Sequence, residues 1–456
     1  MKQCLNCGWG GRHAVGSCIL LVGLALILGA MSPPVDAREF TDVRFIRLSN
    51  GIRLVVRKVP SPLVAVVVSV RGGSAVEPPG ANGVAHLLEH LVFRTANPKL
   101  SPLVQLELLG GYVNADTSRD YTSFYAVVPA RNGELAMRIL SNAMANPSFK
   151  NEAVDFEKRI VSLELMQLRE SDAFVCKELA ERRLYGDHPY GRPFGGQPEG
   201  VAGLTPARAK SFHNAHYRAA NISVIVVGGL NIECVAKTAE KAFSNLPLGA
   251  QVVKADLQAG KVTKQIRPLE VGLASSGVEV VNLAFRAVGF PHPDSAATEI
   301  IATYLGEGPT GRLLTAFKRA RLRTSESIRV EYLTQAQSSA INITCFARGR
   351  DHGKIEKIIL SELNMLKALP IDEVMLTRCK RQLTRLHFEQ TNTVLGQAQL
   401  LAKAEAMGGY QLAGAWLEDV QAVTAQDIMH VARRTFTNDG YVVSALLPPE
   451  SQFGEP

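Results

Sequence analysis

The sequence predicts an α+β protein of two homologous domains, each a mixed, mainly antiparallel sheet with helices packed on one face. The chain of 456 residues is 46% hydrophobic and 20% charged, which is ordinary for a folded protein but too long for one compact core. The pattern of residues 204–228 also returns 219 residues later, where Thr205 matches Thr424 and Tyr217 matches Phe436. A helix followed by a β-branched strand therefore closes each half, which indicates a duplicated domain.

The first 37 residues are typical of an export signal. Lys2 and Arg12 precede an uncharged apolar run, residues 14–31, and small or β-branched residues lead to Ala37. This arrangement predicts a secretory signal that is cleaved after Ala37. An uncleaved anchor is the alternative, because a run of this length falls within the roughly 17–25 residues that a membrane span needs. We expect an exported protein, periplasmic in a Gram-negative bacterium, that is attached to the inner membrane only if this segment is retained.

The rest of the chain is expected to form an N-terminal domain, residues 38–255, and a C-terminal homologous domain, residues 256–456. Turn signals, β-branched runs and helical periodicity set the expected elements of the first domain. They are a hairpin turning at Asn50-Gly51, a buried strand at 63–70, a helix at 83–93, strands at 112–117 and 121–128, a long helix at 151–184, a helix from Thr205 and a strand from Ile222.

Charge and cysteine content exclude some functions. The formal net charge is +8, but the basic residues are scattered and no aromatic residues interleave with them, so we expect no nucleic-acid partner. Four cysteines remain after the leader, and they are far apart and lack metal-ligand spacing: Cys176, Cys234, Cys345 and Cys379. We expect them to be small buried residues. Export would also permit disulfides, whose pairing the sequence leaves open.

Residues 86–90 read His-Leu-Leu-Glu-His and predict a metal site. On a helix, positions i and i+4 share a face, so His86 and His90 can reach one ion, and Glu89 lies beside them. Two imidazoles suit Zn²⁺, whose bound water an adjacent carboxylate can deprotonate. Chance placement on a solvated helix is the alternative. The apolar residues around the pentapeptide instead indicate a buried helix, where unpartnered charge is costly.

A catalytic zinc site needs a third protein ligand. The predicted helix at 151–184 carries Glu157 and Glu164, which lie seven residues and therefore two turns apart on one face. One of them can bind the metal while the other orients a histidine. Each glutamate taken alone is also compatible with an ordinary solvated helix.

Together these residues resemble the pitrilysin/insulinase family of inverzincin metallopeptidases, and most of all its branch that contains the mitochondrial processing peptidase. The similarity covers nearly the whole mature chain. It rests on His86 to His90 with Glu157 and Glu164, on Gly73-Ser74 and Glu77-Pro78-Pro79, on Asn114-Ala115 with Thr117 and Thr122, on His188-Pro189-Tyr190-Gly191, and on the strand from Val224 to Gly228.

The resemblance implies an activity and a role for each residue. Glu164 would be the third zinc ligand, Glu157 the supporting carboxylate, and Glu89 the general base of a zinc metalloendopeptidase. Peptides or unfolded protein segments would add as a strand to a sheet edge at Asn114 and Ala115, which favours extended substrates.

One expected feature of the family is missing from the second half. Complete enzymes of the family place an arginine, and a tyrosine seven residues later, where this chain has Lys318 and Ser325. Lysine lacks the planar fork of arginine, and serine is far shorter than tyrosine. We therefore expect a related partner subunit to supply the pair in a heterodimer. A homodimer and a non-catalytic subunit of such a complex are the alternatives.

Overall fold

The computed structural model describes residues 40–94, 101–249, 270–275, 277–306, 308, 311–322, 328–438 and 440–448. The chain clusters into two units, Met1–Asp36 and Ala37–Pro456, and every element below belongs to the second. The predicted leader and the predicted domain boundary at 255/256 lie outside the described residues. Within the described part of the chain, no helix combines the length and apolar character that crossing a membrane requires.

The first half builds a sheet of six strands in the order β1-β2-β6-β3-β5-β4. β2 and β6 are parallel, and the other neighbours are antiparallel, so the sheet is mixed and mainly antiparallel as predicted. The hairpin at Asn50-Gly51 joins β1 to β2. The strands are β1 (Arg44–Arg47), β2 (Arg53–Lys58), β3 (Leu63–Val70), β4 (Tyr112–Thr117), β5 (Thr122–Pro129) and β6 (Ile222–Gly228).

Among the described residues, the second half repeats the order of the five strands from β2 to β4. Its described strands have the order β7-β11-β8-β10-β9, with one parallel pair, β7 with β11, in the place of β2 with β6. The strands are β7 (Glu270–Leu273), β8 (Glu279–Val288), β9 (Arg329–Leu333), β10 (Ser338–Ala347) and β11 (Tyr441–Leu447). The predicted offset of 219 residues is confirmed, because it superposes the bounds of β6 on those of β11.

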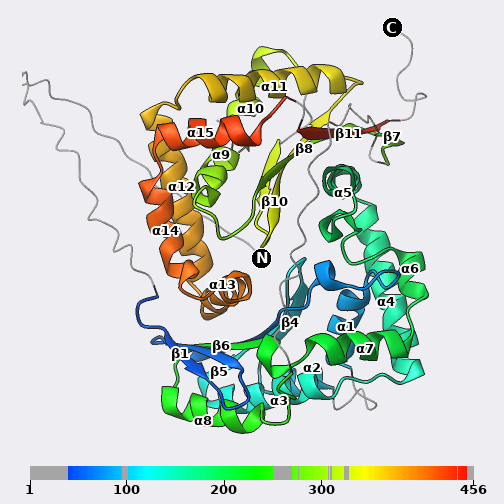
Figure 1. Cartoon of the computed structure of the whole chain (residues 1–456), viewed down its shortest axis with the longest axis vertical. Coiled ribbons are helices and arrows are strands. Elements are labelled where there is room, and N and C mark those ends of the chain that lie inside the picture. Colours follow the sequence, from blue (N-terminus) through cyan, green and yellow to red (C-terminus); the bar gives the residue numbers. More distant parts are fainter. Residues whose placement is uncertain are drawn as a thin grey trace, which may run out of the picture. The chain divides into compact units, whose positions relative to one another are not determined.

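Helices surround both sheets (Figure 1). In the first half they are α1 (Val84–Val92), α2 (Pro102–Leu108), α3 (Gly133–Ala145), α4 (Asn151–Arg169), α5 (Asp172–Tyr185), α6 (Pro198–Ala202), α7 (Pro206–His216) and α8 (Ile232–Ala242). In the second half they are α9 (Ser295–Gly306), α10 (Arg312–Arg319), α11 (His352–Ala368), α12 (Glu373–Thr391), α13 (Val394–Met407), α14 (Leu412–Ala422) and α15 (Ala425–Thr435).

Strand β3 shows how the two faces of the first sheet are covered. Val64, Val66 and Val68 point into the large core formed with the helices of the first half. The alternate residues Ala65 and Val67 pack in a second cluster against α13 of the other half. Because side chains alternate between the faces of a strand, burial on both faces explains why this segment reads as a continuous apolar run.

The two halves cover each other's sheets reciprocally. Each half packs its own helices on one face of its sheet, as predicted. Helix α13 then covers the other face of the first sheet, and α5 covers the other face of the second, against β8 and β11 (Figure 1). The ion pair between Arg53 on β2 and Glu405 on α13, 2.7 Å long and buried, fixes one of these contacts.

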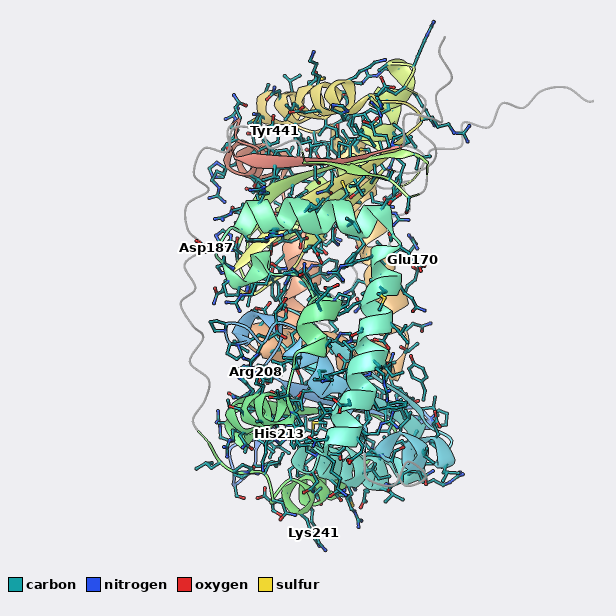
Figure 2. All side chains as sticks on the ribbon, turned by 90° about the vertical axis from the view of Figure 1, so that its right-hand side faces the viewer. Glu170, Asp187, Arg208, His213, Lys241 and Tyr441 are labelled. Carbon is teal, nitrogen blue, oxygen red and sulfur yellow. The ribbon has the colours of Figure 1, made fainter. Side chains whose placement is uncertain are left out.

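Two predictions were wrong in detail. The long helix expected at 151–184 is broken at Glu170, where the chain turns from α4 into α5 (Figure 2). Ser171 begins the new helix, because its hydroxyl accepts the hydrogen bond of the Phe174 amide. Cys234 is exposed rather than buried, whereas the other three mature cysteines are buried, and all four are free thiols.

Candidate metal centre

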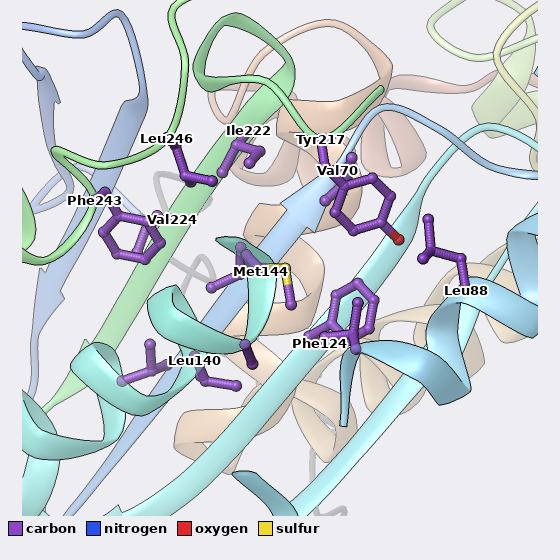
Figure 3. Packing of buried hydrophobic residues seen from close by; sticks show 14 of the residues in the cluster. Val70, Leu88, Phe124, Leu140, Met144, Tyr217, Ile222, Val224, Phe243 and Leu246 are labelled. Atoms are coloured by element: carbon purple, nitrogen blue, oxygen red, sulfur yellow. The ribbon is translucent and has the colours of Figure 1, made fainter. Parts of the chain in front are cut away.

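Helix α1 is held against the core by its apolar side. Leu87, Leu88 and Leu91 are completely buried, and Leu88 packs in the cluster that also holds Phe124 and Tyr217 (Figure 3). The face that carries the two histidines and Glu89 is only partly buried. Apolar packing on one side of the helix therefore presents the polar residues together on the other.

A buried carboxylate fixes the start of this helix. Glu77 accepts hydrogen bonds from the backbone amides of Gly83 at 3.0 Å and Ala85 at 2.9 Å, and from the side chain of Asn82 at 2.7 Å. These amides are among the unpaired donors of the first helical turn, and a negative charge there is favourable. Glu77 thus holds the start of α1, which directly precedes His86.

The two histidines converge on one carboxylate oxygen. Oε2 of Glu164 lies 3.4 Å from Nε2 of His86 and 3.3 Å from Nε2 of His90. Ligand atoms of His86, Glu89 and His90 also lie within 4.8 Å of one another. Residues of α1 and α4 that are far apart in sequence therefore form one cluster. The hydrogen bond to His86 contributes most to lowering the pKa of Glu164, so this carboxylate is ionised at neutral pH.

Glu157 holds the far side of the His90 ring. Its Oε2 lies 3.1 Å from Nδ1 of His90, and its Oε1 accepts a hydrogen bond from Arg94. A proton on Nδ1 leaves Nε2 with a free lone pair that points at Glu164. Burial alone would lower the pKa of His90, but the hydrogen bond to Glu157 and the neighbouring carboxylates raise it. Glu157 is therefore placed to orient this imidazole.

Glu89 is held by Thr117 at the end of strand β4. The Thr117 hydroxyl donates a hydrogen bond to Oε2 of Glu89. Burial raises the pKa of Glu89 above its ordinary value, while the charge of His86 and this hydrogen bond act in the opposite direction. A carboxylate with a raised pKa is a better proton acceptor near neutral pH than an exposed one.

The His86 ring lies against Gly195. A Cβ at position 195 would come 3.2 Å from Nδ1 of His86, and the backbone there has a φ of 71°. Both the space and the left-handed conformation favour glycine. Nδ1 of His86 is buried and finds no hydrogen-bond partner among the residues that the structure describes.

The donor set fits a divalent ion such as zinc. Oε2 of Glu164 lies within 3.4 Å of the Nε2 atoms of both His86 and His90, so three potential ligand atoms are already close together. Three protein donors of these types with one position left for water are the arrangement of catalytic zinc sites. His86, His90 and Glu164 are the residues that could hold such an ion, with Glu89 beside it.

The structure brings together the five residues predicted from sequence, His86, Glu89, His90, Glu157 and Glu164. No role was predicted for Thr117, and Arg94 was not among the predicted residues. Arg94 lies two residues beyond the end of α1, so helical spacing did not predict its contact with Glu157. The contact of Thr117 with Glu89 is set by the packing of β4 beside α1 and has no local signal.

The remaining predicted residues occupy two other places. Asn114 and Ala115 lie on β4, which forms the edge of the first sheet. Lys318 lies exposed in the last turn of α10. Ser325 lies outside the described residues.

Comparison of the sequence with known families identifies its relatives. The profile described as Insulinase (Peptidase family M16) matches residues 53–197, which include the whole site, and the profile described as Peptidase M16 inactive domain matches residues 203–383. The chain belongs to the M16 (insulinase) family. It is similar to an uncharacterized zinc protease of Rickettsia bellii, with 23% identity over 90% of this chain and 98% of the relative. It is also similar to the mitochondrial-processing peptidase subunit beta of Lentinula edodes, with 26% identity over 92% of each chain.

Solved structures of M16 peptidases share the fold. A protease from Helicobacter pylori aligns with a TM-score of 0.80 over 89% of this chain and 99% of its own, at 21% identity. An M16-like peptidase from Alicyclobacillus acidocaldarius aligns with a TM-score of 0.76 over 89% of this chain and 98% of its own, at 17% identity. The two-sheet architecture of this chain is therefore that of M16 peptidases.

Proposed function

We propose that this chain is the zinc-binding, catalytic subunit of an endopeptidase that hydrolyses extended oligopeptides or unfolded protein segments. The observation that carries the proposal is the convergence of the Glu164 carboxylate on His86 and His90 beside the partly buried Glu89. The zinc proteases among the relatives of this M16 chain support zinc as the ion.

Each residue of the site then has a separate task. His86, His90 and Glu164 would hold a zinc ion, which would supply a Lewis acid next to Glu89. Glu89 would accept a proton from the attacking water and return it to the departing amine. Thr117 keeps the Glu89 carboxylate in place through its hydrogen bond. Glu157 fixes the orientation of the His90 ring.

The free edge of β4 is the proposed site for the substrate backbone. Among the described strands β4 pairs only with β5, and α1 with the metal centre lies beside it. A peptide that adds to this edge at Asn114 and Ala115 would form main-chain hydrogen bonds and pass the metal in an extended conformation. This binding mode requires an unfolded substrate and tolerates many sequences.

A related partner subunit is the second part of the proposal. The second half carries Lys318 in place of the expected arginine, so an arginine and a tyrosine from another chain would hold the substrate and the transition state. Relatives that bear the name of a processing-peptidase beta subunit support a two-subunit enzyme. A homodimer is the alternative assembly. From the sequence of residues 1–37 we also propose that the enzyme is exported, periplasmic in a Gram-negative cell, and attached to the inner membrane only if this segment is retained.

The test is cleavage of an unstructured fluorogenic peptide by the zinc-loaded chain, with and without its candidate partner. Glu89→Gln should keep its zinc and lose about 10²-fold or more of the turnover, the usual share of a general base. Glu152→Gln, at an exposed position of α4, is the matched control and should be fully active. Turnover by the Glu89→Gln variant at the wild-type rate would refute the mechanism. Zinc binding without cleavage in the complex would instead indicate a non-catalytic binding subunit.

A further inference from the structure

A cavity of about 420 Å³ begins beside the metal centre. It lies where the turn after β4 meets the second half of the chain. Its wall includes Thr117, Tyr121, Phe194, Gln335, Lys403 and Met407. Because Thr117 also holds the Glu89 carboxylate, a peptide that follows the β4 edge past the metal reaches this cavity within a few residues.

The other charged groups on the cavity wall are held by partners. Arg119 lies 3.5 Å from Glu181 and donates a hydrogen bond to the carbonyl of Arg192 at 2.8 Å. Lys177 pairs with Glu331 at 2.9 Å, and Glu178 pairs with Arg169 at 3.3 Å. Asp120 accepts hydrogen bonds from the Tyr190 hydroxyl at 2.5 Å and from the Ala336 amide at 3.0 Å. The charge of each of these groups is therefore already at least partly balanced by a neighbouring residue.

Lys403 differs from them. It is partly buried on α13, and its ammonium group has no hydrogen bond or ion pair within 4.0 Å among the described residues. The nearby acid Glu299 accepts the Trp416 indole N–H at 2.6 Å instead. Burial lowers the pKa of Lys403, and the charge of Glu299 counteracts this from a greater distance. Partial burial of a cation without a close partner costs part of its hydration, and an anionic ligand would relieve that cost.

We propose that Lys403 binds a carboxylate of the peptide substrate in this cavity. The inference rests on the proposed peptidase function and adds a substrate preference to it. Carboxylates are the anionic groups of an unmodified peptide, and a single ammonium provides one point charge that matches one of them. The carboxylate can come from an aspartate or glutamate side chain near the cleaved bond or from the C-terminus of a short peptide.

Binding is measured on the inactive Glu89→Gln protein, with its partner if the complex requires one. The labelled peptides form a matched set: one glutamate or glutamine at successive positions, each with a free or an amidated C-terminus. We expect at least one acidic peptide to bind about tenfold more tightly than its neutral counterpart, the effect of one charge-assisted hydrogen bond. If the preferred peptide differs by its glutamate, Lys403 binds a side-chain carboxylate; if it differs by its free C-terminus, Lys403 binds the terminal carboxylate.

Two substitutions of Lys403 and one matched control decide the assignment. Lys403→Met should abolish the preference and leave binding of the neutral peptides unchanged, whereas Lys403→Arg should retain it. Lys177→Met removes a cation from the same wall that is already paired with Glu331, so the preference should persist. If Lys403→Met does not fold, salt provides the second measurement, because the preference of the Glu89→Gln protein must shrink as ionic strength rises.

Equal affinity for acidic and neutral peptides would overturn the proposal. An equal loss of affinity for both kinds of peptide in Lys403→Met would also overturn it, because Lys403 would then have only a structural role. Turnover by the wild-type protein is measured in parallel with the same peptides. A binding preference without turnover would refute the proposed peptidase function and leave the carboxylate site standing, so the two failures are distinguishable.

Discussion

Replacing Glu157 by glutamine should weaken zinc binding while the three proposed ligands stay in place. The Glu157 residue is 4% exposed, and the two oxygens of its side chain contact Nδ1 of His90 and Nε of Arg94. Glutamine keeps the size of the side chain but removes the charge that favours a proton on Nδ1 and makes Nε2 a stronger donor. Loss of such a supporting carboxylate lowers metal affinity about 10- to 100-fold, or about 1.4–2.7 kcal/mol.

The assay is a competition titration of apo-protein and a zinc-chelating dye at pH 7 and fixed ionic strength. Thermal melting of the apo-proteins verifies that the variant folds. Glu152→Gln makes the same chemical change on the exposed side of the same helix and should leave the affinity unchanged. Zinc affinity of Glu157→Gln equal to that of the wild type would show that Glu157 does not support the metal site. An equal loss in both variants would attribute the effect to the net charge of α4.

Two further predictions concern Glu89, the proposed general base, and the contact between the halves. Thr117→Val removes the hydrogen bond that lowers the pKa of Glu89, so that pKa should rise. The acidic limb of the kcat/KM profile should then move to higher pH, and turnover at pH 7 should fall by roughly tenfold; an unchanged profile would argue against this contact. Glu405→Gln leaves buried Arg53 without its charge partner, which should cost about 3 kcal/mol in urea unfolding. Glu389→Gln, in an exposed pair with Arg385, should cost less than about 1 kcal/mol; similar losses in both variants would refute the distinction.

Much of the secondary structure follows from local sequence. The β-branched run from Leu63 to Val70 has the predicted bounds of β3, because a strand buried on both faces leaves a continuous apolar signal. The duplication was equally visible, since Thr205 and Thr424 begin equivalent helices. The break between α4 and α5 was missed, because neither glycine nor proline marks it and Ser171 is a weaker signal.

The candidate metal centre likewise has one part that local sequence predicts and another part that depends on tertiary packing. Spacing within one helix places His86, Glu89 and His90 on a common face, because the geometry of an α-helix is local. The positions of Glu157 and Glu164 against those histidines depend on how α4 packs beside α1, and the bond from Thr117 to Glu89 depends on where β4 ends. Periodicity shows which residues share one face of a helix, but only the packed structure shows which other element contacts that face.

The sequence by itself determined the two homologous sheet-forming halves, the placement of His86, Glu89 and His90 on one helix face, and the family to which the chain belongs. Only the tertiary structure showed that α13 covers the first sheet and α5 the second, or that Lys403 meets the end of β4 in one cavity. The physical reason is that these contacts join residues more than 90 positions apart. No local propensity reports them, and they form only when apolar faces from both halves are buried together.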